Sequence, residues 1–128
     1  MKYAINADGF PDAIGSSSQG TTAGRFVFIS GQIALDKVNP KCLVAGGIED
    51  QTNRVIDLAE QLLAEVGCQL SDVAQTTVYL AHMEDFAAMD AVYAERFGRP
   101  APARSVVEVS KLPLDELIEM DCVAWRLR

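Results

Sequence analysis

The sequence predicts one α+β domain in which two helices cover one face of a β-sheet. Two observations indicate this fold class: the predicted elements follow the order strands, helix, strand, helix, strands, and each helix has a single apolar stripe. A helix with one apolar stripe must bury it against another layer, which here is a sheet. No linker or low-complexity tract divides the chain, so residues 1–128 are expected to fold as one domain.

The first half of the chain contains a loop, a strand and the longer helix. Residues 15–20 are small and predict a loop, whereas residues 25–30 have the composition of a strand and are followed by a short apolar run at 33–35. From Ile48 to Val66, apolar residues recur at spacings of four and three, which predicts a helix. Gly67 is typical of the position that ends such a helix.

The second half alternates strands with the second helix. Residues 73–80 predict a strand whose even-numbered residues, from Ala74 to Leu80, share one face. Residues 86–97 carry aromatic and apolar side chains at helical spacing and are followed by Gly98. Two further strands are expected at 104–109 and near 117–127.

The last strand predicts a partner for the sheet. Met120 and Cys122 are apolar on one face, and Val123 and Trp125 are apolar on the other. One chain of this size has no third layer to cover the second face. We therefore expect a homo-oligomer that packs through its sheets.

Composition argues against several classes of function. The formal net charge is −7, whereas a protein that neutralises phosphates is normally basic, so nucleic-acid binding is disfavoured. His82 is the only histidine, so one subunit cannot form the active site of a two-histidine ribonuclease or a multi-histidine metal site. Its position at a predicted strand-to-helix junction indicates a surface or capping role. No apolar run approaches the length of a membrane span and the N-terminus lacks an apolar signal core, so we expect a cytoplasmic protein.

Cysteine and serine positions exclude further chemistry. Cys42, Cys68 and Cys122 are odd in number and widely spaced, which argues against a disulfide framework and a zinc site, and the last two are expected in the core. Residues 15–20 lack the lysine of a phosphate-binding loop, and Ser17 and Ser30 have no hydrolase triad signature around them.

Arg104 is the remaining candidate for binding a ligand. It follows Pro100 and Pro102 at the entrance of a strand, and its guanidinium matches a carboxylate or phosphate with two parallel donors. Glu119 and Asp121 point the same way in the last strand, and a carboxylate beside an apolar pocket can act as a general acid or base. Three interpretations of Arg104 stay open: a solvated edge charge, a structural ion pair with one of these acids, or a clamp for an acidic ligand.

Several motifs occur in one order over nearly the whole chain. They include Ser30-Gly31-Gln32-Ile33, Thr76-Thr77-Val78-Tyr79, Pro102-Ala103-Arg104-Ser105 and Ile118-Glu119. In these motifs the chain resembles the RidA/YjgF family of enamine/imine deaminases, also described as endoribonuclease L-PSP. The resemblance implies a chorismate-mutase-like sheet with two helices on one face. It also implies a homotrimer packed through the sheets, with sites in clefts between subunits.

The resemblance implies a role for each matched residue. Arg104 would grip the carboxylate of a 2-imino or 2-amino-2-enoic acid, and Gly31 and Val106 would offer backbone groups near it. Ser30 and Ser17 would complete the substrate-binding set, and Glu119 would position or activate the attacking water. The implied reaction is hydrolysis to a 2-keto acid and ammonia without a metal or organic cofactor, for which orientation and proton transfer suffice.

Three positions depart from the pattern of that family. Ser17 stands where deaminating members carry tyrosine, Val106 stands where cysteine is frequent, and Asp90 stands where asparagine is common. The space beside Ser17 would admit a bulkier imino acid. A non-catalytic carboxylate-binding or chaperone-like trimer is therefore the alternative. Net charge and the single histidine argue against the ribonuclease activity that the second family name suggests.

Overall fold

The computed structural model describes residues 1–127. The strands of this part of the chain are β1 (Lys2–Ala4), β2 (Gly20–Ala23), β3 (Phe26–Ile33), β4 (Val73–Leu80), β5 (Ala103–Glu108) and β6 (Ile118–Trp125). The α-helices of the same range are α1 (Ile48–Ala64) and α2 (Phe86–Phe97), and the short 3-10 turns are η1 (Leu70–Asp72), η2 (Met83–Asp85) and η3 (Pro113–Asp115).

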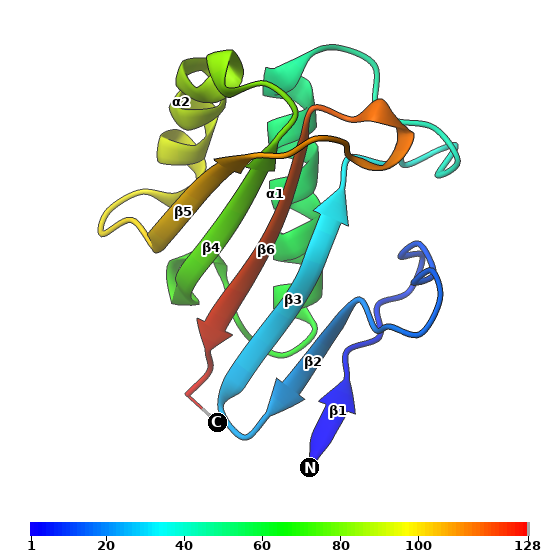
Figure 1. The fold of residues 1–128 in the computed structure, drawn as a ribbon. Helices are drawn as coiled ribbons and strands as arrows, with labels where there is room; N and C mark the ends of the chain where they lie inside the picture. Colours follow the sequence, from blue (N-terminus) through cyan, green and yellow to red (C-terminus); the bar gives the residue numbers. More distant parts are fainter. Residues whose placement is uncertain (128) are drawn as a thin grey trace.

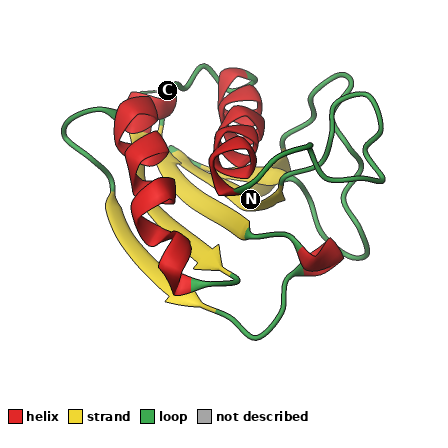
Figure 2. Ribbon diagram, turned by 90° about the horizontal axis from the view of Figure 1, so that it is seen from above, coloured by secondary structure: helices red, strands yellow, loops and turns green. Residues whose placement is uncertain are grey.

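The strands form one sheet in the order β1-β2-β3-β6-β4-β5 (Figure 1). Neighbouring strands are antiparallel except β4 and β5, which run parallel and are connected through α2. A parallel pair needs such a crossover, and the helix supplies it. Both helices lie on the same face of the sheet (Figure 2), which confirms the predicted α+β architecture.

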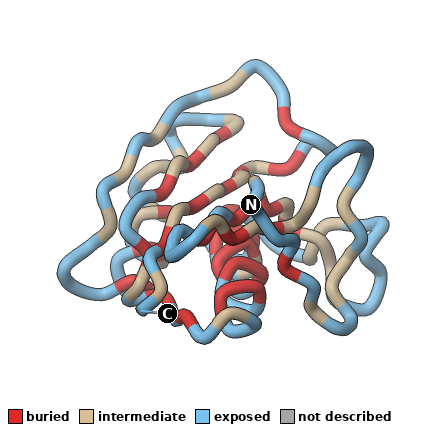
Figure 3. The backbone as a smooth tube through the Cα atoms, turned by 90° about the horizontal axis from the view of Figure 1, so that it is seen from below, coloured by how far each residue is buried: buried red, intermediate tan, exposed pale blue. Residues whose placement is uncertain are grey.

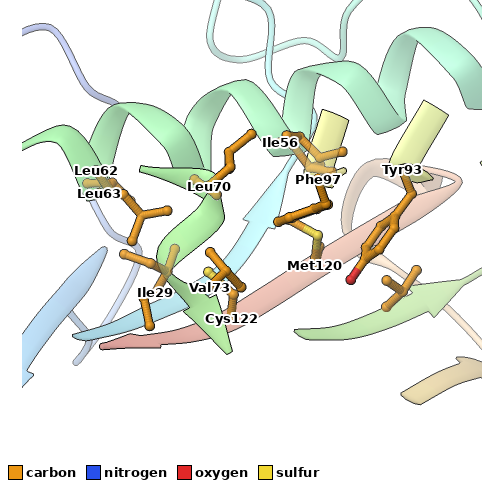
Figure 4. Close-up of a cluster of buried hydrophobic side chains, with 14 of the residues drawn as sticks. Ile29, Ile56, Leu62, Leu63, Leu70, Val73, Tyr93, Phe97, Met120 and Cys122 are labelled. Atoms are coloured by element: carbon orange, nitrogen blue, oxygen red, sulfur yellow. The ribbon is translucent and has the colours of Figure 1, made fainter. Parts of the chain in front are cut away.

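The core lies between the helices and the central strands. From α1, Val55, Ile56 and Leu62 are fully buried, and from β6 Met120 and Cys122 face them (Figure 4). Burying an isoleucine or leucine side chain of this kind contributes about 2 kcal/mol. Figure 3 shows the same distribution: α1 and the middle of the sheet are mostly buried, whereas the outer loops are exposed. Cys68 is also buried, as predicted, and Cys42 is exposed.

The longer helix ends two residues before the predicted Val66, at Ala64. Gly67 adopts a left-handed conformation with φ 75°, and the amide of Cys68 donates a hydrogen bond to the carbonyl of Leu63. This closing hydrogen bond turns the chain away from the helix axis. The predicted role of Gly67 at the helix end is therefore confirmed.

Two β-bulges alter the strands that the sequence predicts. In β4 the register shifts between Val73 and Gln75, so Ala74 is exposed and the predicted shared face for Ala74 is wrong. In β3 the shift falls between Ile29 and Gln32, and the strand ends at Ile33, so it contains only the first residue of the predicted apolar run at 33–35. A bulge adds a residue on one strand only and re-aims the side chains beyond it.

The face of the sheet opposite the helices carries an aromatic patch, formed by Phe26, Phe28 and Trp125. The rings of Phe26 and Trp125 meet edge to face with centroids 5.1 Å apart, although these residues are 50% and 45% exposed. Val27, which alternates with the two phenylalanines, is fully buried under the helices. We call the helix-free side of the sheet the open face. No helix within residues 1–127 is long and apolar enough to cross a membrane.

Candidate functional site

Arg104 lies on β5, the outermost strand at its edge of the sheet, opposite Thr76 of β4. Its guanidinium carbon lies 4.7 Å from the centroid of the Tyr93 ring and 5.3 Å from that of Phe86, both on α2. Such contacts hold a cation by its attraction to the ring face. Tyr93 is fixed in turn, because its hydroxyl oxygen lies 2.6 Å from the hydroxyl oxygen of Thr76. Burial is the main cause that raises the pKa of Tyr93.

One carboxylate neutralises Arg104. Nη1 of Arg104 donates a 2.7 Å hydrogen bond to Oδ1 of Asp90, and this is its only protein acceptor among residues 1–127. A guanidinium carries five N–H donors, so the others have no protein acceptor among residues 1–127. The predicted structural partner of Arg104 was Glu119 or Asp121, and that pairing is wrong.

Glu119 lies on β6 between Ile33 of β3 and Tyr79 of β4. Ile118 and Met120 on either side are buried under the helices, so the Glu119 side chain points to the open face. There it lies over Gly31, where a Cβ atom would overlap its carboxylate. Burial raises the pKa of Glu119, and the neighbouring carboxylate of Asp121 raises it further.

Asp121 lies beside Glu119 on the open face, as the strand spacing predicts. It accepts a 3.0 Å hydrogen bond from the hydroxyl of Tyr79. This hydrogen bond is the largest cause that raises the pKa of Tyr79. Glu119 and Asp121 have no basic partner within the described part of the chain, so this part of the open face is acidic.

Arg104 and Glu119 lie on opposite faces of the sheet within one chain. Arg104 is in register with Thr76 and Cys122, whose side chains are buried under the helices, whereas Glu119 points to the open face. Two strand spacings and three residues separate their Cα atoms, which corresponds to about 14 Å. One chain therefore does not bring the predicted catalytic pair together.

The predicted serine and glycine residues line a cavity near the end of β3. The loop of residues 10–19 folds over the end of β3 and encloses about 190 Å³, with Ser17, Ser30 and Gly31 in its wall. The rest of the wall is largely apolar and includes Ile33. The hydroxyl of Ser30 donates a 2.6 Å hydrogen bond to the carbonyl of Ser18, and the hydroxyl of Ser17 donates to Ile14 in the same loop.

Val106 lies two residues after Arg104 on β5 and faces the helices, packed against the core. The predicted site residues thus fall into two groups. Arg104 and Val106 belong to the edge strand β5, whereas Ser17, Ser30, Gly31 and Glu119 surround the end of β3.

The sequence does not predict the roles of two acidic residues near these groups, the ion pairing of Asp90 and the burial of Glu116. Asp90 shares a helix face with Phe86 and Tyr93 at spacings of four and three, a signal that could have revealed it as the partner of Arg104. Glu116 gave no comparable signal, because it lies in the turn after η3. It is fully buried, with Oε1 accepting a 3.4 Å hydrogen bond from the amide of Ala34 and Oε2 without a hydrogen-bond partner among residues 1–127. Burial raises the pKa of Glu116 to about 8.

His82 precedes η2 and is exposed, so the predicted surface position is confirmed. His82 is the N-cap residue of η2 by position, but its side chain makes no capping hydrogen bond within the described residues. Of the two predicted roles, surface or capping, the structure supports the surface role. Nδ1 lies 3.9 Å from Oε1 of Glu84, a weak surface contact. In the described range, residues 1–127, no group of three or more His, Cys, Asp and Glu side chains could hold a metal ion.

Comparison with known proteins places these residues in a family. The family model described as endoribonuclease L-PSP matches residues 8–126. A RutC family protein of Pyrococcus horikoshii is 46% identical over 126 residues, covering 98% of this chain and 99% of that protein. A mouse protein named 2-iminobutanoate/2-iminopropanoate deaminase is 32% identical over 124 residues, covering 97% of this chain and 91% of that protein.

The fold agrees with the sequence comparison. The crystal structure of the YjgF gene product from E. coli has a TM-score of 0.88 and 31% identity, and the match covers 97% of this chain and 98% of that one. These matches span nearly all of both chains. The chain belongs to the endoribonuclease L-PSP family, which is also the RidA/YjgF family.

Proposed function

We propose that this protein hydrolyses reactive 2-imino and enamine acids to 2-keto acids and ammonia without a cofactor. The observation that carries the proposal is the guanidinium of Arg104, held between α2 and β5 with most of its donors open. A planar donor fork of this kind binds a carboxylate with two parallel hydrogen bonds. The name of the mouse relative, a 2-iminobutanoate/2-iminopropanoate deaminase, supports the same substrate class.

In the proposed reaction, water adds to an electrophilic carbon that Arg104 orients through the substrate carboxylate. The water oxygen attacks the imine carbon, and Glu119 takes a proton from the water. The protonated Glu119 returns that proton to nitrogen, which gives a carbinolamine. Glu119 then takes the hydroxyl proton of the carbinolamine and gives it to the same nitrogen as the carbon–nitrogen bond breaks. Ammonia leaves, and the hydroxyl oxygen becomes the keto oxygen of the 2-keto acid. A carboxyl group whose pKa is raised by burial suits this exchange near neutral pH.

The proposal needs two copies of the chain. Arg104 and Glu119 lie on opposite faces of one sheet, so we assign Arg104 and the backbone of Val106 to one subunit and Glu119, Gly31, Ser30 and Ser17 to its neighbour. The aromatic patch supports contact through the open faces, since exposed aromatic groups of this kind favour burial on association. We propose the homotrimer that the family resemblance implies.

A direct assay tests the reaction. The protein is mixed with enzymatically generated 2-iminobutanoate, and 2-oxobutanoate release is followed over the spontaneous rate. We expect clear acceleration, and a loss of about 100-fold or more in kcat/KM for R104A and for E119Q. E95Q, which removes an exposed charge from α2, is the matched control and should match the wild type. Wild-type protein that gives no acceleration with several imino acids would contradict the proposal.

A binding protein without turnover is the second candidate. The hydroxyl of Ser17 donates to the carbonyl of Ile14 in its own loop, which does not favour a role in holding water. In that case 2-oxobutanoate would raise the melting temperature of the wild type but not of R104A, and no keto acid would form. Turnover that depends on Glu119 would rule this candidate out.

A further inference from the structure

Asp90 and Arg104 lie side by side in the wall of a surface cavity of about 320 Å³ at the end of α2. Its Oδ1 atom accepts the 2.7 Å hydrogen bond from Arg104, while its side chain stays 42% exposed. No hydrogen bond reaches its Oδ2 atom from residues 1–127. Arg104 and Asp90 both line the cavity, together with Arg99. A ligand in this cavity therefore meets one negative and two positive groups.

A carboxylate that binds Arg104 must lie close to Asp90, because Asp90 already occupies one nitrogen of the same guanidinium. Two carboxylates on one small cation repel each other, and partial burial of Arg104 strengthens that repulsion. The ion pair consequently weakens binding of a ligand whose only charge is a carboxylate.

A zwitterionic ligand avoids this repulsion. A 2-iminium acid carries a protonated nitrogen on the carbon next to its carboxylate. That nitrogen can donate to the open oxygen of Asp90 while the carboxylate takes the free donors of Arg104. The keto acid product has a carbonyl oxygen in place of the nitrogen, so it has no proton to donate and faces Asp90 with lone pairs.

We propose that Asp90 makes the Arg104 site prefer zwitterionic 2-iminium acids over their 2-keto acid products. The inference rests on the proposed function, since it takes Arg104 as the residue that binds the acid. Asp90 is then a specificity residue that favours entry of the substrate and release of the product.

The test compares two probes with the same carbon chain, 2-aminobutanoate as the zwitterion and 2-oxobutanoate as the plain anion. Their Kd values are measured by calorimetry for the wild type and for D90N. The asparagine keeps an oxygen for Nη1 of Arg104 and removes only the charge. We expect the ratio of the two Kd values to shift about tenfold or more toward 2-oxobutanoate, with stronger product inhibition in turnover assays. E95Q, which removes a charge elsewhere on α2, should leave the ratio unchanged.

A ratio that stays within threefold of the wild type in D90N overturns the inference, as does failure of both proteins to bind either probe. The two proposals fail separately. Imine hydrolysis by the wild type with an unchanged ratio in D90N removes the role of Asp90 and leaves the activity standing. A shifted ratio in D90N without any hydrolysis by the wild type removes the activity and leaves the effect of Asp90 on binding.

Discussion

The two faces of the sheet differ in whether their charged side chains have partners within the same chain. On the helix-covered face, Arg104 is ion-paired with Asp90 and flanked by aromatic rings, and Glu116 is buried beside the amide of Ala34. On the open face, Glu119 and Asp121 lie side by side with no basic partner in the described range. On the covered face Arg104 thus finds its counter-charge within one chain. The open face leaves acidic and aromatic groups that a second chain can use.

The largest test of this comparison separates the two faces by mutation. R104A and E119Q are each expected to be inactive, but subunits of both kinds, unfolded together and refolded as a mixture, should regain activity. Mixed oligomers contain some clefts with an intact Arg104 from one chain and an intact Glu119 from the other. We expect recovery of about a quarter of the wild-type rate, measured as 2-oxobutanoate release. Because each variant alone is expected to be slower than the wild type by about 100-fold or more, this recovery is readily distinguished from the activity of either variant. A mixture that stays as inactive as its components would place both residues in one chain's site.

The next test breaks the open face itself. F28D puts a charge into the aromatic patch and should prevent association, because an unpaired buried charge at an interface is costly. Light scattering should give the mass of one chain for F28D and a multiple of it for the wild type. V38D adds the same charge to a side chain that is 92% exposed in a loop, and it should behave as the wild type does. If F28D formed an oligomer of the same mass as the wild type, the open face would not be the interface.

A third test uses pH to measure how the buried acid Glu116 affects stability. The pKa of Glu116 is raised from 4.5 to about 8, so the folded state binds a proton that the unfolded state has lost between these values. Its contribution to stability is complete below pH 4.5 and is lost as the pH rises toward 8. For E116Q, the free energy of unfolding in urea should lack this decline, which amounts to about 2 kcal/mol or more from pH 5 to 8. If the free energy of unfolding depended on pH in the same way for E116Q and the wild type, the assigned effect of Glu116 would be contradicted. E95Q, which removes a charge from an exposed glutamate, is the control.

The smallest effect is expected from a single methyl group on the open face. G31A places a Cβ atom where the Glu119 carboxylate lies, so the carboxylate must move. We expect about a tenfold loss in kcat with a small change in the free energy of unfolding, because misplacing a catalytic group costs rate before it costs stability. The double variant G31A/E119Q should lose no more activity than E119Q alone. Additive losses would show that the methyl group acts elsewhere.

Most of the fold follows from the sequence because its helices are strongly periodic. The stripe from Ile48 onward and the aromatic positions of α2 predict both helices to within two residues. The pattern does not predict β1 or β2, because three exposed residues and four small ones carry no alternation. Ala74 is misplaced for a different reason: a bulge changes the alternation without changing the residue types.

The candidate site was harder to predict because it depends on strand order. Arg104 and Glu119 both belong to strands, but only the parallel pairing of β4 with β5 fixes which face Arg104 takes. Its partner Asp90 has a local signal on α2, in line with Phe86 and Tyr93. Glu116 has none, because burial in a turn is set by the packing of Ala34 and η3 around it.

The contact between Gly31 and Glu119 has a consequence for how relatives of this protein diverge. The space for the carboxylate exists only while residue 31 lacks a side chain. A lineage that keeps the glutamate loses activity when alanine replaces the glycine, because the carboxylate must move, whereas one that has lost the glutamate does not. The two positions should therefore change together among homologues, and a side chain at position 31 should mark members that have given up the acid.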